Sequence, residues 1–155
     1  MLKTPTTHSS PLNASTDRVL SVLYIEDVRT EQISILQSMS HSGIIADMVI
    51  HKASTMTEGM VMLEKETIDV ILLDLDLPDS KSLKSISLLK SAFPDIPIVI
   101  LSGHSEEAIA TEALMMGADE FLIKGECSGI MIKQTLRQAV VKNGMRQKQP
   151  PPISS

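Results

Sequence analysis

The chain has 155 residues, enough for one domain, and it carries 14 Lys and Arg against 19 Asp and Glu. Its net charge of −5 argues against a basic nucleic-acid interface, and its single cysteine excludes an internal disulfide and a multi-cysteine metal site. With one Tyr, two Phe and ten Met, the predicted core is aliphatic. No targeting segment and no apolar run of about 18 residues is visible, so we expect a cytoplasmic protein without a membrane partner.

The two ends of the chain differ in composition from its middle. Residues 1–17 are rich in Ser and Thr and have no apolar period, so we expect a flexible N-terminal arm. Residues 144–155 contain three consecutive prolines, which is typical of an extended tail or of a linker to a further domain. The predicted domain therefore spans residues 18–143.

Within this domain, apolar runs typical of buried strands alternate with segments of helical period. Thr55 and Glu58 have the spacing of a capping box, and Gly117 is typical of a helix end. In chain order the predicted elements are a strand at 19–25, a helix around 35–39, a strand at 45–50, a helix around 56–63, a strand at 70–73, a helix around 86–93, a strand at 96–101, a helix around 109–116, a strand at 121–123 and a helix around 132–139.

The order (βα)₅ predicts an α/β fold, namely a doubly wound, five-stranded parallel sheet with helices on both faces. In such sheets ligands bind beyond the carboxyl ends of the strands. We therefore expect the functional residues in the segments that follow the strands.

Charged and polar residues follow four of the predicted strands. Glu26 and Asp27 follow the first, Asp74 the third, Ser102 the fourth and Lys124 the fifth. Clustered carboxylates repel one another, so a hard cation is expected among them, and an all-oxygen site suits Mg²⁺ better than Zn²⁺. A cation beside a carboxylate also suggests phosphoryl transfer, with Asp74 as nucleophile and with Lys124 and Ser102 contacting phosphoryl oxygens.

Four motifs in this order resemble the receiver domain of two-component response regulators. They are the pair Glu26-Asp27, ILLDLDLP at 71–78, LSG at 101–103 and GADEFLIKG at 117–125. The resemblance covers about residues 18–143 and implies a flavodoxin-like receiver fold. One departure is Gly125, which stands where the family usually has a proline and makes a cis peptide improbable there.

The resemblance also implies a role for each site residue. Asp74 corresponds to the phosphoacceptor and Lys124 to the phosphate-binding lysine, while Ser102 and Phe121 correspond to the switch hydroxyl and the switch aromatic. The implied Mg²⁺ ligands are Glu26, Asp27, Asp74 and the backbone carbonyl of Asp76.

By the same resemblance, the phosphoryl donor is a sensor histidine kinase or a phosphotransfer protein. The domain is then a phosphoacceptor that catalyses its own phosphorylation and dephosphorylation, not an enzyme in the usual sense. Phosphorylation is expected to reshape the surface of the fourth helix, fifth strand and fifth helix for an effector or for a second copy of the chain.

Asp76 and His104 stand two residues after the acceptor and two residues after the switch serine. If the third and fourth strands are adjacent, these side chains overhang the phosphoryl group and form a gate against attacking water. A protonated His104 would close it, so the phosphoryl group would survive longer at low pH. The alternative is that both are unrelated exposed residues.

Two other functions remain open from the sequence. Asp74-Leu75-Asp76 resembles the Asp-x-Asp motif of haloacid-dehalogenase-type phosphohydrolases, but Pro78 stands where that motif has Thr and no later acidic pair follows a strand. A receiver-fold interaction module without phosphorylation would lack the acidic pair, the acceptor or the lysine, all of which are present here.

Overall fold

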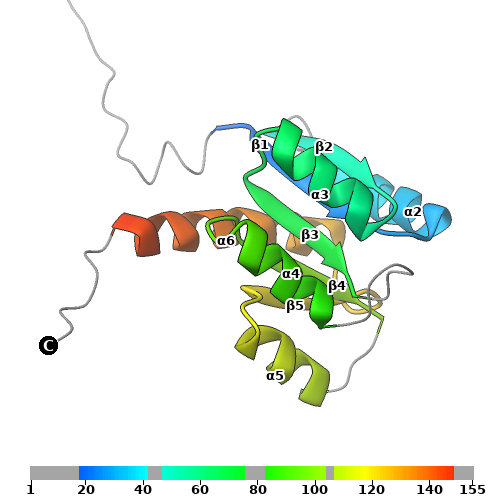
Figure 1. Ribbon diagram of the computed structural model, residues 1–155. Coiled ribbons are helices and arrows are strands. Elements are labelled where there is room, and N and C mark those ends of the chain that lie inside the picture. The colour runs from blue at the N-terminus through cyan, green and yellow to red at the C-terminus, as the bar shows by residue number, and fades with distance from the viewer. Residues whose placement is uncertain (1–17, 42–46, 76–82, 104–106, 149–155) are drawn as a thin grey trace, which may run out of the picture.

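The computed structural model describes residues 18–41, 47–75, 83–103 and 107–148, in which strands and helices alternate (Figure 1). The five strands are parallel, in the order β2-β1-β3-β4-β5, and this confirms the doubly wound α/β fold. The elements are β1 (Leu20–Ile25), α2 (Arg29–His41), β2 (Met48–Ala53), α3 (Met56–Lys65), β3 (Val70–Asp74), α4 (Lys84–Ala92), β4 (Ile98–Ser102), α5 (Glu107–Met115), β5 (Glu120–Ile123) and α6 (Gly129–Lys148).

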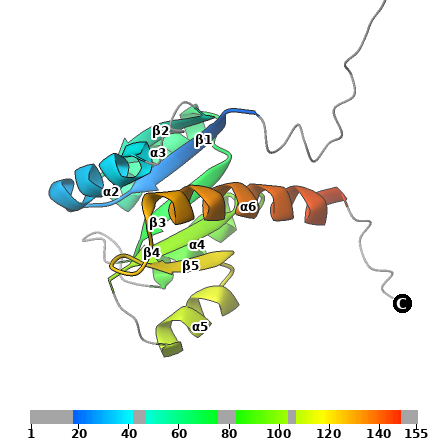
Figure 2. The ribbon, with the colours of Figure 1, turned by 180° about the vertical axis from the view of Figure 1, so that it is seen from behind.

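The helices cover both faces of the sheet. Helices α3, α4 and α5 lie on the face seen in Figure 1, and α2 and α6 lie on the face seen from behind in Figure 2. Successive strand residues point to opposite faces, so Leu23 and Ile25 of β1 join the core under α3 and α4, whereas Val22 and Tyr24 join the core under α2 and α6. Burial on both faces explains the nearly continuous apolar runs of the central strands.

Strand β2 spans Met48–Ala53 and so ends three residues past its predicted end at 50, while positions 45 and 46 of the prediction lie outside the described residues. Its register with β1 runs from the pair Leu20 and Met48 to the pair Ile25 and Ala53. Strand β2 lies at the edge of the sheet and contains the polar residues His51 and Lys52. An edge strand accepts such residues, which is why the apolar pattern ended before the strand did.

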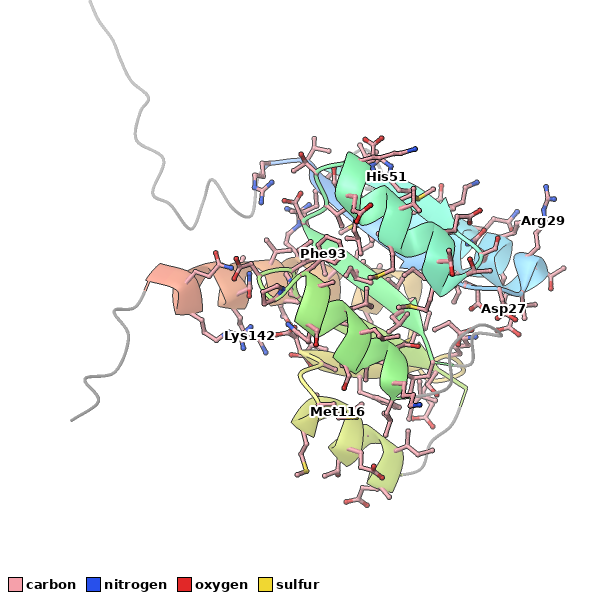
Figure 3. The ribbon with its side chains drawn as sticks, in the orientation of Figure 1. Asp27, Arg29, His51, Phe93, Met116 and Lys142 are labelled. Carbon is pink, nitrogen blue, oxygen red and sulfur yellow. The ribbon has the colours of Figure 1, made fainter. Side chains whose placement is uncertain are left out.

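Helix α6 continues to Lys148, five residues past the predicted end of the domain at 143. Arg146 pairs with Asp119 at 2.7 Å, and the side chain of Asn143 donates to the carbonyl of Asp95 at 2.8 Å. These contacts hold the last turns of α6 against the amino-terminal edge of the sheet. Lys142 of α6 and Asp27 accordingly lie at opposite ends of the molecule (Figure 3).

Local signals in the sequence are confirmed at two helix ends. The hydroxyl of Thr55 accepts the N–H of Glu58 at 3.1 Å, and the Glu58 carboxylate accepts the N–H of Ser54 at 2.6 Å. Gly117 follows α5 with a φ of 115°, a conformation that favours glycine. Among the described helices, none is both long and apolar enough to span a membrane.

Candidate functional site

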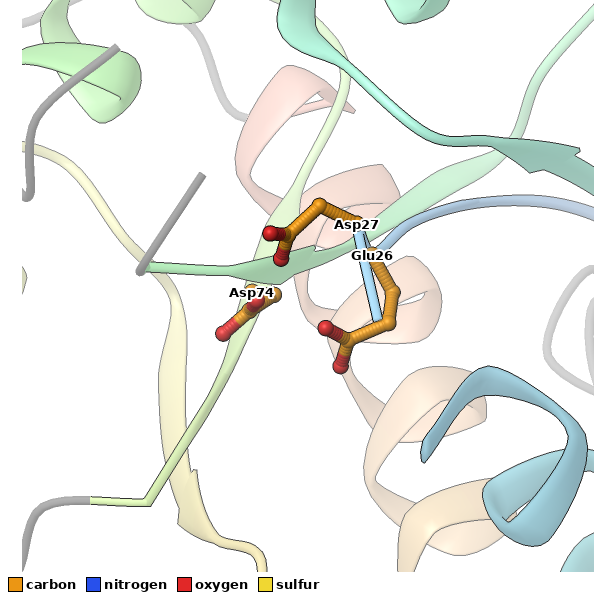
Figure 4. A group of neighbouring side chains, drawn as sticks. All are labelled: Glu26, Asp27 and Asp74. Atoms are coloured by element: carbon orange, nitrogen blue, oxygen red, sulfur yellow. The ribbon is translucent and has the colours of Figure 1, made fainter. Parts of the chain in front are cut away.

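The predicted strand-end residues meet where the order of the sheet reverses. The chain leaves β1 for the edge strand β2 and then crosses back to β3, so the carboxyl ends of β1 and β3 flank the topological switch point. Glu26 and Asp27 directly follow β1, and Asp74 is the last residue of β3. Their carboxyl groups lie together at this edge (Figure 4).

The three carboxylates form a compact acidic cluster. One oxygen each of Glu26, Asp27 and Asp74 lies within 4.8 Å of the others, and Glu26 and Asp74 are each only 1% exposed. Within the described part of the chain, the buried Oδ1 of Asp27 has no hydrogen-bond partner. A buried oxygen without a donor is costly, and a divalent cation at this point would satisfy it. The donor set therefore fits a hard cation such as Mg²⁺.

Glu26 is held in place by neighbours from its own segment and from β2. Its backbone N–H donates to the carbonyl of Ala53 at 3.0 Å, and its Oε2 accepts the N–H of Val28 at 3.3 Å. The hydroxyl of Tyr24 donates to Oε1 of Glu26 at 3.4 Å. Burial and the negative charges of Glu26 and Asp74 raise the pKa of Tyr24, so its hydroxyl stays protonated and remains a donor.

Lys124, which follows β5, supplies the positive charge of the site. Its Nζ lies 2.9 Å from Oε1 of Glu26 and 3.4 Å from Oδ1 of Asp74, and it also pairs with Oε1 of Glu31 on α2. Burial by itself would lower the pKa of Lys124, but the hydrogen bonds to Glu31 and Glu26 and the charge of Asp74 raise it on balance. The ammonium is thus charged at neutral pH and partly offsets the carboxylates.

Comparison with known proteins identifies the family. The family model described as "Response regulator receiver domain" matches residues 22–138. The chain belongs to the response regulator receiver domain family. This assignment favours the receiver interpretation over the phosphohydrolase alternative.

Three relatives illustrate the similarity. The receiver is 33% identical over 96 residues to the regulatory protein LuxO of Vibrio cholerae, covering 62% of this chain and 21% of LuxO. It is 31% identical over 104 residues to the KDP operon transcriptional regulatory protein KdpE of Escherichia coli, covering 67% of this chain and 44% of KdpE. A receiver domain structure from Clostridium thermocellum matches with a TM-score of 0.65 and 26% identity over 84% of this chain and 98% of that one. The chain thus spans less than half the length of these two regulators.

The receiver places Ser102 and Phe121 on adjacent strands, β4 and β5. Ser102 is fully buried as the last residue of β4, and its carbonyl accepts the backbone N–H of Lys124 at 2.8 Å. Phe121 is partly buried and lines an open cavity of about 630 Å³ between α5 and β5, together with Leu114 and Ile123. Ser102 is therefore linked to the acidic cluster through Lys124, whose backbone contacts Ser102 and whose ammonium contacts Glu26 and Asp74. Phe121 faces α5.

Two predicted residues lie outside the described part of the chain, and one predicted backbone feature is observed. Asp76 and His104 lie outside the described residues, so both the gate and the Asp76 carbonyl ligand stay predictions. No peptide bond among the described residues is cis, as expected for Gly125 after Lys124.

Sequence reasoning missed two residues that contact the site. Tyr24 stands two positions before Glu26 along the direction of β1, and residues two apart on a strand point to the same side, so its contact with Glu26 had a signal in the sequence. Glu31 had none, because its partner Lys124 is 93 positions away. They meet because the first turn of α2 follows β1 and Lys124 follows β5, so that both lie at the carboxyl edge of the sheet.

Proposed function

We propose that this receiver accepts a phosphoryl group on Asp74 from a histidine kinase or a phosphotransfer protein in a Mg²⁺-dependent reaction. The observation that carries this proposal is the buried Asp74 carboxylate, which belongs to the acidic cluster and whose Oδ1 lies 3.4 Å from the ammonium of Lys124. A nucleophile at that point adjoins both a candidate cation site and a fixed positive charge. We also propose that the protein acts in the cytoplasm, as the sequence leads us to expect.

Each group has a role in the transfer. A carboxylate oxygen of Asp74 attacks phosphorus, and the bond between phosphorus and the donor atom breaks, with its electron pair leaving on the donor. Glu26, Asp27 and Asp74 would hold Mg²⁺, which would supply positive charge to offset the negative charge of the acceptor and of the phosphoryl oxygens. Lys124 neutralises a second phosphoryl oxygen, and the hydroxyl of Ser102 donates to a third.

The output surface proposed for the phosphorylated state comprises α5, β5 and α6. Strand β5 is an edge strand, and Leu114 and Met115 of α5 are exposed, Met115 to 80%. A hydroxyl of Ser102 that moves toward the phosphoryl group leaves space for Phe121 to turn inward, which changes this surface. We propose that an effector or a second copy of the receiver binds there.

The direct test of the function is phosphorylation by a small acyl phosphate. With acetyl phosphate and Mg²⁺, intact-mass spectrometry should show one phosphoryl adduct per chain, and a chelator should prevent it. Asp74→Asn should abolish the adduct because the amide is not a nucleophile. Asp95→Asn, which makes the same change at an exposed aspartate away from the cluster, should retain it. An adduct that persists in Asp74→Asn would place the acceptor elsewhere.

The two acids after β1 are expected to differ in their importance for Mg²⁺. Asp27→Asn should weaken Mg²⁺ binding by about tenfold or more, because the buried Oδ1 of Asp27 has no hydrogen-bond partner among the described residues and is available to a cation. Glu26→Gln should weaken it by only about threefold, because the oxygens of Glu26 already accept from Tyr24, Val28 and Lys124. Calorimetry is the appropriate measurement, since the chain contains no Trp. Equal losses, or a larger loss for Glu26→Gln, would refute this ranking.

A further inference from the structure

Lys124 has a carboxylate partner that does not belong to the acidic cluster. Glu31 lies in the first turn of α2, where the helix dipole favours a negative charge, and its Oε1 pairs with Nζ of Lys124. The side chain of Glu31 is 47% exposed, whereas that of Lys124 is 19% exposed and those of Glu26 and Asp74 are at most 2% exposed. Glu31 is therefore the one partner in this group that is free to swing into solvent.

The distances show where the ammonium is held. Nζ of Lys124 is closer to Glu26 and Glu31 than to Asp74, whose Oδ1 is 3.4 Å away. A cation bound in the cluster would share Glu26, which would weaken the pairing of Lys124 with Glu26. Glu31 lies outside the cluster and keeps its full charge for Lys124. An incoming phosphoryl oxygen must then compete with Glu31 for the ammonium.

We infer that Glu31 is a positioning residue that restrains phosphorylation by competing with the phosphoryl group for Lys124. This inference rests on the proposed function. In the resting state the pair with Glu31 keeps the ammonium partly neutralised. During transfer from acetyl phosphate, Asp74 forms its bond to phosphorus and the bond between phosphorus and the acetyl oxygen breaks, so that acetate leaves with its electron pair. Lys124 then exchanges Glu31 for a phosphoryl oxygen while Glu31 turns to solvent.

The test compares Glu31→Gln with the unchanged protein in two measurements. At saturating Mg²⁺, the rate of phosphorylation by acetyl phosphate should rise about two- to fivefold, the range that a partly exposed ion pair can supply. The affinity for Mg²⁺, measured by calorimetry without any donor, should fall about twofold, because an ammonium without Glu31 repels the cation more strongly. A substitution that merely distorted the site would lower both quantities.

Two control variants separate the effect of the direct contact between Glu31 and Lys124 from the effect of net charge. Thr30→Glu combined with Glu31→Gln keeps the net charge but moves the carboxylate about 100° around α2. It should phosphorylate as fast as Glu31→Gln, and a rate like that of the unchanged protein would overturn the inference in favour of long-range repulsion. Glu64→Gln, at an exposed position near the far end of α3, should change neither quantity.

The remaining outcomes distinguish the inference from the proposed function. If the unchanged protein is phosphorylated on Asp74 but Glu31→Gln is equally fast or slower, the competition is refuted and the function stands. If the unchanged protein forms no adduct at all, the function fails and the inference fails with it. An unchanged or tighter Mg²⁺ affinity in Glu31→Gln also refutes the inference, without recourse to phosphorylation.

Discussion

Lys124→Ala is expected to lower the free energy of unfolding by about 2–3 kcal/mol when no divalent cation is present. The change leaves the buried carboxylates of Glu26 and Asp74 without their ammonium. Breaking a fully buried ion pair costs about 3–5 kcal/mol. The loss expected here is smaller because the side chain of Lys124 is 19% exposed and because Glu26 retains hydrogen bonds from Tyr24 and Val28. Urea denaturation in the presence of a chelator measures the loss.

The same variant should bind Mg²⁺ about tenfold more tightly, because the ammonium no longer repels the cation. Mg²⁺ should consequently restore more stability to Lys124→Ala than it adds to the unchanged protein. The matched control is Lys142→Ala, which removes a 53% exposed lysine that pairs with Glu120 at 2.7 Å and should cost less than about 1 kcal/mol. Equal losses for the two lysine variants, or weaker Mg²⁺ binding by Lys124→Ala, would contradict this account of the site.

Gly129→Ala is expected to destabilise the protein by about 1–3 kcal/mol, although the residue lies in a helix. A Cβ at Gly129 would overlap the carbonyl oxygen of Ser38 and lie 2.6 Å from the backbone nitrogen of Met39. Both atoms belong to α2, so the start of α6 must move away from α2 to admit a methyl group. The loss is measured by chemical denaturation.

Gly144→Ala is the matched control on the same helix, because no heavy atom of the described residues lies within 4 Å of a Cβ at Gly144. There alanine should stabilise the protein by about 0.4–1 kcal/mol, since it restricts the unfolded chain without a clash. The two substitutions are chemically identical and differ only in surroundings. Changes of the same sign at both positions would show that α2 and α6 do not approach as closely as the structure indicates.

The order of the elements and the residues at the strand ends were predictable from the sequence. Runs such as 70–73 and 96–101 are apolar because both faces of the central strands are buried, and that signal is local. Once a parallel sheet is inferred, its carboxyl edge must collect Glu26, Asp27 and Asp74. The boundaries of β2 and the end of α6 were not predictable, because polar edge residues and the distant contact of Arg146 with Asp119 determine them.

The sequence by itself determined the fold class and the acidic cluster, because these follow from periodicity and from residues adjacent to strand ends, and its motifs carried the resemblance to the receiver family. Only the tertiary structure decided which carboxylates pair with the ammonium of Lys124. Glu31 is 93 positions from that lysine, and nothing local to either residue indicates the pair. The close approach of Gly129 to Ser38 is likewise a property of two packed helices. Both contacts join α2 to residues about 90 positions later in the chain. Contacts between segments so far apart leave no periodic pattern in a single sequence.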